Sequence, residues 1–196
     1  MDNTYNLLLA IIVISALGTL AHFYYDWSGH NRIIGLFTAV NESTWEHIKI
    51  ALTPTIIWSI YDGAIYGRNP NYFLAKILSL LVIVVFIPTI FYSYQKITKK
   101  SLLFINIIIF YLAIVLSQLT FYAILALSPV NFIFQYFACL STFVFFGCYM
   151  TLTLEPLKIF LFKDPISGKY GFHANVHIFK KRKKSKKSVA KTKSKS

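Results

Sequence analysis

Acidic and imidazole side chains gather in two short stretches of an otherwise apolar chain, where they form a donor set for metal or acid–base chemistry. His22 and Asp26 are four residues apart, and so are Glu42 and Glu46. Residues four apart share one face of a helix. Carboxylates and imidazoles together bind Zn, Mn or Fe, and a metal-activated water can hydrolyse an ester or phosphoester. The candidate metal ligands are therefore His22, Asp26, Glu42, Glu46 and His47.

Three of these residues are also candidate catalytic groups, because a carboxylate or a histidine can act as a general base. They are Glu42, Glu46 and His47. Their spacing is not that of the H-E-x-x-H signature of metalloproteases. The pattern therefore indicates a kind of chemistry without identifying a known enzyme class.

Two simpler interpretations of the same residues remain open. Ser43 and Glu46 have the spacing of a capping box, in which a serine and a glutamate satisfy free backbone donors at a helix start; Asn41 is an alternative cap. The charges also suit a structural or transport-linked ion network. The pairs expected in that network are Glu46 with Lys49 and Asp26 with Arg32.

The elements that position these residues are predicted to be membrane-spanning helices. The chain has 196 residues, 56% of them hydrophobic, and a mean hydropathy of +0.58. Its apolar runs are long enough to cross a hydrocarbon core of about 30 Å at 1.5 Å per residue. We expect an all-α, polytopic bundle of five spans, at about residues 5–25, 44–66, 72–94, 101–125 and 130–154.

The distribution of Lys and Arg predicts the orientation of this bundle, since basic loops stay in the cytoplasm. The link after the third span carries Lys96, Lys99 and Lys100, the link "LSPVN" carries no basic residue, and the C-terminal tail is densely basic. The C-terminus is therefore expected in the cytoplasm, the N-terminus outside, and the protein in the plasma membrane. The ends of the first two spans would then meet at the cytoplasmic face.

A few further polar residues fall within the predicted spans. Asp62 is a candidate for a hydrogen bond between helices; because it is near the outer end of the second span, contact with water is the alternative. The other candidates for hydrogen bonds between helices are Asn106, Gln118 and Gln135.

Three stretches of the sequence, "HFYYDWSGHN", "FTAVNESTWEHIKI" and "KIFLFKDPISGKYG", resemble a family of small bacterial integral membrane proteins of unknown function. The resemblance lies in two motifs. One is a V-N-E-S-x-W-E-H-x-K block after the first helix, and the other is a D-P-x-T/S-G-x-Y-G motif after the last helix. The resemblance implies no activity. It implies that the hallmark positions are His22, Trp27, Asn41, Glu42, Ser43, Trp45, Glu46, His47, Lys49 and residues 164–171.

The residues after the last span divide into two parts. Residues 163–179 are rich in turn signals, such as Asp164-Pro165 and Gly168. They form either a plain surface turn or, with His173 and His177, a segment that folds back over the His22–Glu46 cluster. Residues 180–196 are predicted to be a disordered basic tail, and residues 1–162 the transmembrane domain.

The basic tail suits an anionic lipid surface, at about 1 kcal/mol for each basic residue near it. Contact with the ribosome or RNA is an alternative partner, because phosphate attraction needs no sequence code.

Two functions fit the sequence. The first is a multi-pass membrane protein with a structural or transport-associated role, in which the polar cluster stabilises the fold. The alternative is a membrane-embedded, metal-assisted hydrolase or transferase that acts on a lipid or lipid-linked substrate with Zn, Mn or Fe as cofactor.

Overall fold

The computed structural model describes residues 3–174, which form six α-helices and two short 3-10 helices. The α-helices are α1 (Asn3–Trp27), α2 (Arg32–Phe37), α3 (Thr44–Tyr66), α4 (Tyr72–Thr98), α5 (Leu103–Leu125) and α6 (Phe132–Leu154). The 3-10 helices are η1 (Phe160–Phe162) and η2 (Gly171–Ala174). The β-structure of this part of the chain is one isolated bridge between Lys163 and Tyr170. The predicted all-α fold is confirmed, and residues 175–196, with the basic tail, lie outside the described residues.

Four of the helices, α1, α4, α5 and α6, are long and apolar enough to cross a membrane. The large side chains exposed on α5 and α6 are mostly Leu, Ile and Phe, as a lipid-facing surface requires. Helix α3 has 23 residues but contains Glu46, Lys49 and Asp62, so it does not qualify by composition. The membrane architecture is thus supported for four helices, whereas the fifth span and the orientation of the termini remain predictions.

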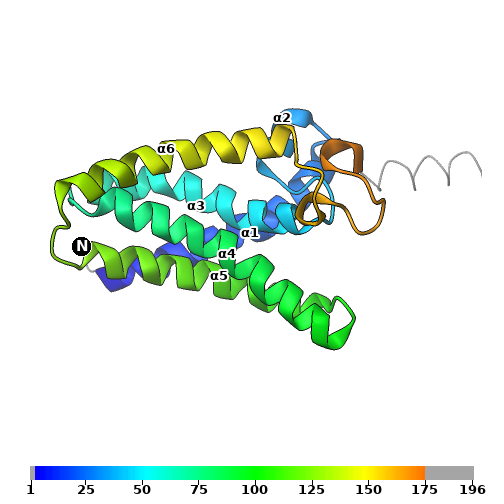
Figure 1. Ribbon diagram of the computed structural model, residues 1–196, viewed down its shortest axis with the longest axis horizontal. Helices are drawn as coiled ribbons and strands as arrows, with labels where there is room; N and C mark the ends of the chain where they lie inside the picture. The colour runs from blue at the N-terminus through cyan, green and yellow to red at the C-terminus, as the bar shows by residue number, and fades with distance from the viewer. Residues whose placement is uncertain (1–2, 175–196) are drawn as a thin grey trace, which may run out of the picture.

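Figure 1 shows the long helices running roughly along one axis. Helix α4 packs against α3, α5 and α6, and α1 packs against α3 and α5. Helix α2 and the C-terminal 3-10 helices lie at the end of the bundle where α3 begins (Figure 1). We call this end the motif end, because it holds residues 39–49.

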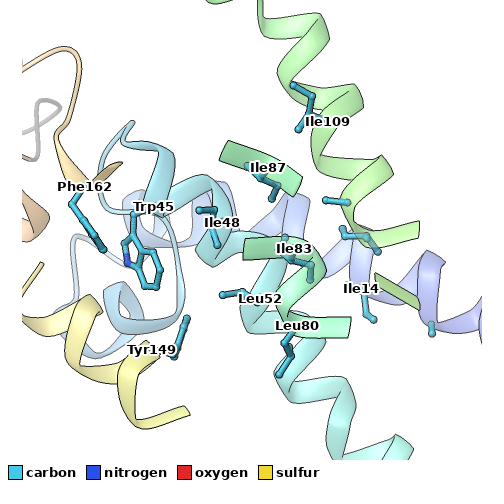
Figure 2. Packing of buried hydrophobic residues seen from close by; sticks show 14 residues of the cluster. Ile14, Trp45, Ile48, Leu52, Leu80, Ile83, Ile87, Ile109, Tyr149 and Phe162 are labelled. Carbon is cyan, nitrogen blue, oxygen red and sulfur yellow. The ribbon is translucent and has the colours of Figure 1, made fainter. Parts of the chain in front are cut away.

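The main hydrophobic core runs between α1, α3, α4 and α5, with Ile14, Leu52 and Ile83 fully buried (Figure 2). At the motif end the core continues through Trp45, whose ring centroid lies 5.0 Å from that of Phe162 and 6.2 Å from that of Tyr149. Helix α3 is therefore held by α6 and by the segment that follows α6.

Gly18 allows α1 to approach α3 closely. A Cβ at this position would lie 2.7 Å from the carbonyl oxygen of Ile50. Small residues at helix contacts allow such approaches in membrane bundles.

We expect Gly18→Leu to lower the free energy of unfolding by about 1–3 kcal/mol, since overpacking displaces the backbone. The matched control is Gly147→Leu in α6, where an added Cβ meets no atom within 4 Å. Thermal unfolding in detergent compares the two variants, and equal melting temperatures would contradict close α1–α3 packing.

The predicted hydrogen bond of Asp62 between helices is confirmed, and the alternative, that Asp62 reaches water, is wrong. Asp62 is 0% exposed, and Lys76 Nζ donates a hydrogen bond of 2.6 Å to its Oδ2. The sequence places both residues near helix ends, but α3 and α4 are antiparallel neighbours, so the two side chains meet between them. The positive charge of Lys76 offsets part of the free-energy cost of burying the Asp62 carboxylate away from water.

The other polar residues within the predicted spans differ in their hydrogen-bond partners. Asn106 Oδ1 accepts a hydrogen bond from the Tyr94 hydroxyl, which links α5 to α4 as predicted. Gln135 instead donates to the carbonyl of Val130, just before its own helix. Gln118 is fully buried, and residues 3–174 supply no hydrogen-bond partner for its amide group.

Candidate functional site

The C-terminal end of α1 lies beside the start of α3, as the sequence predicts for consecutive spans. The ring centroids of His22 and His47 are 6.0 Å apart. The backbone N–H of Ala39 donates to the carbonyl of Ala21 over 3.3 Å, which ties the loop before α3 to α1. The polar residues of these two segments therefore meet at one level of the bundle.

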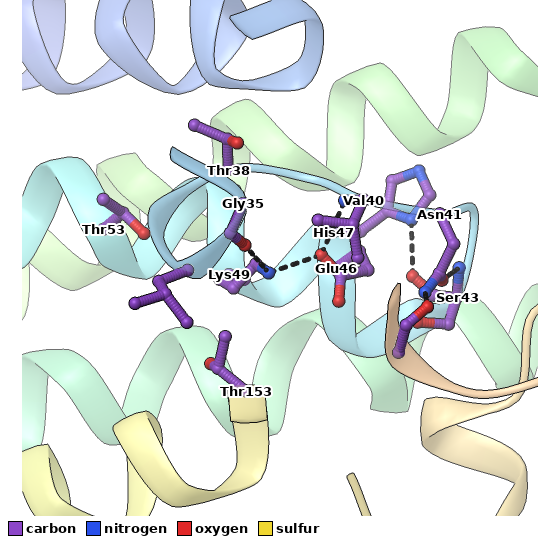
Figure 3. A network of polar contacts seen from close by, with 12 residues as sticks. Gly35, Thr38, Val40, Asn41, Ser43, Glu46, His47, Lys49, Thr53 and Thr153 are labelled. Carbon is purple, nitrogen blue, oxygen red and sulfur yellow. Dashed lines mark hydrogen bonds and ion pairs between the residues drawn. The ribbon is translucent and has the colours of Figure 1, made fainter. Parts of the chain in front are cut away.

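Glu46 and Lys49 form a buried ion pair within the first turns of α3. Lys49 Nζ lies 2.7 Å from Glu46 Oε2 and donates a second hydrogen bond of 2.9 Å to the carbonyl of Gly35 (Figure 3). The same carboxylate oxygen accepts the backbone N–H of Val40 at 3.0 Å. The predicted Glu46–Lys49 pair is confirmed, and it binds α2 and the following loop to α3.

The start of α3 does not form the predicted capping box. Ser43 occupies the N-cap position, but its side chain makes no capping hydrogen bond. Glu46 reaches back to Val40 instead of Ser43, because the buried Lys49 ammonium holds its carboxylate. Asn41 Oδ1 accepts the N–H of Ser43 at 2.8 Å, an Asx turn that leads into the helix.

His47 is held in one tautomer by the backbone. Its Nδ1 lies 2.9 Å from the carbonyl oxygen of Ser43 (Figure 3). A carbonyl only accepts hydrogen bonds, so Nδ1 carries the proton and Nε2 of the neutral ring has a free lone pair. Nε2 lies 3.9 Å from Glu42 Oε2, and about a third of each side chain is exposed. The pair therefore presents an imidazole nitrogen and a carboxylate side by side at the surface of the motif end.

Asp26 pairs with a different partner from the one predicted. Among the described residues, Asp26 pairs with His30, whose Nε2 lies 3.1 Å from Asp26 Oδ1, and not with Arg32. His30 has φ = +69°, so the chain turns sharply after α1 and returns the ring to the carboxylate.

The C-terminal segment folds back onto the block that precedes α3, which confirms the fold-back in the second of the two predictions for it. Asn41 Nδ2 donates to the carbonyl of Gly171 at 3.0 Å. Asp164 is 0% exposed, and its carboxylate accepts the N–H groups of Glu42 at 3.2 Å and of Ser167 at 2.7 Å. His173 is exposed, and His177 lies outside the described residues.

We expect Asp164→Ala to lower the free energy of unfolding by about 1.5–3 kcal/mol, the usual contribution of a hydrogen bond to a charged group. Hydrogen–deuterium exchange should then increase in residues 163–171 and at Glu42, and not in α5. Asp26→Ala, at an exposed carboxylate, is the matched control. Unchanged exchange in residues 163–171 would show that Asp164 does not hold the segment.

A cavity of about 20 Å³ borders His47, between α3, α4 and α5. This volume accommodates about one water molecule, which needs two to four polar partners. Its lining offers Thr44, His47 and Asn106 among apolar side chains of α4 and α5.

The five predicted site residues thus fall into three groups. Glu46 is buried and pairs with Lys49, and Asp26 pairs with His30. Glu42 and His47 form a partly exposed pair next to His22. Within the described range, no three His, Cys, Asp or Glu side chains stand close enough together to hold a metal ion. The contacts of Gly35 with Lys49 and of Asp164 with Glu42 could not be predicted from the sequence, apart from the turn that the Asp164-Pro165 motif indicates.

Comparison with known proteins gives one match. Residues 2–172 match the model of a family of unknown function (DUF6512). No curated protein and no solved structure matches the chain.

Proposed function

This chain belongs to the DUF6512 family, a family of unknown function, and we propose that it is a membrane-embedded hydrolase or transferase with Glu42 and His47 as its acid–base pair. The protein would lie in the plasma membrane with five spans, its N-terminus outside and the motif end at the cytoplasmic face. The substrate would be the headgroup of a lipid or lipid-linked molecule. Headgroups lie at the membrane surface, where the partly exposed Glu42 and His47 side chains would also lie.

The observation that carries this proposal is the geometry of His47. The Ser43 carbonyl fixes the proton on Nδ1 and leaves Nε2 basic, 3.9 Å from the Glu42 carboxylate. When Nε2 takes a proton, the adjacent carboxylate stabilises the imidazolium. A base positioned in this way activates a water or hydroxyl nucleophile, and the cavity beside His47 has room for one water.

The buried residues of the block support the pair. Asn41, Glu46 and Lys49 are each less than a tenth exposed, and all three bond to the backbone of neighbouring segments. Catalytic geometry requires supporting side chains that are themselves held in place.

A divalent ion, Zn, Mn or Fe, is the proposed cofactor, and His22, Glu42 and His47 are the side chains that would hold it. Such an ion would act as a Lewis acid on the headgroup ester. The three side chains would have to approach one another more closely to bind it, because they do not form a ready metal-binding group within residues 3–174.

We expect the purified protein to contain about one equivalent of such an ion, and Glu42→Ala and His47→Ala to lose it. Glu155→Ala, at an exposed carboxylate after α6, should retain it. Elemental analysis of protein purified without chelators measures this. Metal-free native protein would remove the cofactor from the proposal and leave the acid–base pair to be tested by turnover.

A structural or transport-associated role is the second candidate. It is favoured by the buried Glu46–Lys49 pair, whose atoms bond only within the fold. In that case Glu42 and His47 could be replaced without loss of any reaction. Anionic lipid remains the proposed partner of residues 180–196, with ribosome or RNA contact as the alternative.

A further inference from the structure

A second buried ion pair lies at the end of the bundle opposite the motif end. Lys76 Nζ is 2.6 Å from Asp62 Oδ2, and the side chains are 1% and 0% exposed. The ammonium also lies 4.1 Å from the ring centroid of Phe121, on α5. The pair therefore joins α3 to α4 and is covered by α5.

The second carboxylate oxygen of Asp62 has no hydrogen-bond partner among the described residues. The indole of Trp58, one turn earlier in α3, is near enough to interact with the Asp62 carboxylate, but its buried N–H makes no hydrogen bond of standard geometry among the described residues. Buried polar atoms left in this state normally have a functional explanation or an ordered water. Asp62 Oδ1 thus offers a place for a proton.

Within residues 3–174, the groups around the pair include tyrosines but no second carboxylate. Tyr72 on α4 and Tyr122 on α5 are near enough to interact electrostatically with Asp62. Tyr61 and Tyr66 on α3 bond to Asn6 of α1, and Arg68 is exposed beyond the end of α3. The other described carboxylates belong to the motif end or follow α6, and they are Asp26, Glu42, Glu46, Glu155 and Asp164.

We propose that Asp62 is a proton-binding site and that its protonation loosens the packing of α3 against α4. Ionisable groups inside membrane bundles are costly, so they are kept in pairs and usually mark a functional site. A proton from solvent that adds to the Asp62 carboxylate removes the counter-ion of Lys76. The ammonium then remains buried without its partner, which favours separation of the two helices and entry of water.

This site uses none of the residues of the surface pair at the motif end, so its function is independent of the proposed enzyme. It would give the bundle a proton-linked conformational change of the kind that transport requires. For this step, the part of the chain that the structure describes provides one carboxylate at this end of the bundle, and not a relay of several.

The test uses the full chain in lipid nanodiscs. Infrared spectra of protein with ¹³C-labelled Asp carboxylates, recorded from neutral to acidic pH, should show a reversible carboxylic-acid band from Asp62. Hydrogen–deuterium exchange, corrected for intrinsic rates, should become several-fold faster in residues 58–66 and 72–79 over the same pH interval. In Asp62→Asn/Lys76→Met, which has no buried charge at this site, the Asp62 band should be absent and the exchange of these residues independent of pH.

Circular dichroism must show native helix content throughout, and Asp26→Asn controls for an exposed aspartate. An Asp62 band that never appears while the native protein stays folded would overturn the proposal. A band without faster exchange, or the same pH-dependent exchange in the double variant, would overturn it as well. If the double variant does not fold, the charge-swapped Asp62→Lys/Lys76→Asp replaces it, and loss of the band's original pH dependence is then the expected result.

Discussion

Lys49→Met is expected to lower the free energy of unfolding by about 3–5 kcal/mol. The substitution keeps the length of the side chain but removes the cation that lies 2.7 Å from Glu46. The Glu46 carboxylate is only 3% exposed, so it would remain in the interior without a counter-ion, and a lone buried charge is destabilising by about this amount. The Gly35 carbonyl would also lose its donor.

Chemical or thermal unfolding in detergent measures this effect. Lys158→Met, at an exposed lysine after α6, should leave stability unchanged. The double variant Glu46→Gln/Lys49→Met should recover much of the loss, because it removes both charges together. If Lys49→Met were as stable as the native protein, the ion pair would not hold α2 to α3.

His47→Gln is expected to reduce turnover of the lipid substrate by about 10²–10⁴-fold, the usual contribution of general acid–base catalysis. Gln lacks a basic nitrogen and cannot take the proton that Nε2 accepts. The side chain is about one-third exposed, so its loss should change stability little, within about 0.5 kcal/mol.

The measurement is mass spectrometry of the products formed from vesicles that contain phospholipids or polyprenyl phosphates. His173→Gln, at an exposed histidine outside the pair, should retain full turnover. Equal turnover by His47→Gln and native protein would exclude His47 as the base. Absence of turnover in the native protein on all these substrates would favour the structural or transport-associated role.

Several features of the site could be predicted because they depend on local spacing. Consecutive long helices pack side by side, so His22 and His47 were expected to meet, and their rings are 6.0 Å apart. The Glu46–Lys49 pair follows from residues three apart on one helix. The D-P turn motif was sufficient to predict a turn, and one of its two interpretations placed it over the cluster.

The errors concern choices that depend on distant parts of the chain. Glu46 could either cap the helix or pair with Lys49, and the burial of Lys49 under Gly35 decides for the pair. Asp62 could either reach water or find a cation, and the packing of α4 against α3 supplies Lys76. Local sequence specifies neither the depth of a side chain nor its partner on another helix.

The roles within the V-N-E-S-x-W-E-H block were not separable from sequence, since Glu42 and Glu46 are alike in type and four apart. The structure separates them. Glu46 is buried and bonded to Lys49 and Val40, whereas Glu42 is half-exposed and lies beside His47.

The most direct test of this division compares Glu42→Gln with Glu46→Gln, two identical substitutions four residues apart, by the free energy of unfolding in detergent. We predict that Glu42→Gln unfolds like the native protein, and that Glu46→Gln loses about 3–5 kcal/mol because Lys49 is left buried and unpaired. Equal stabilities of the two variants would contradict the account.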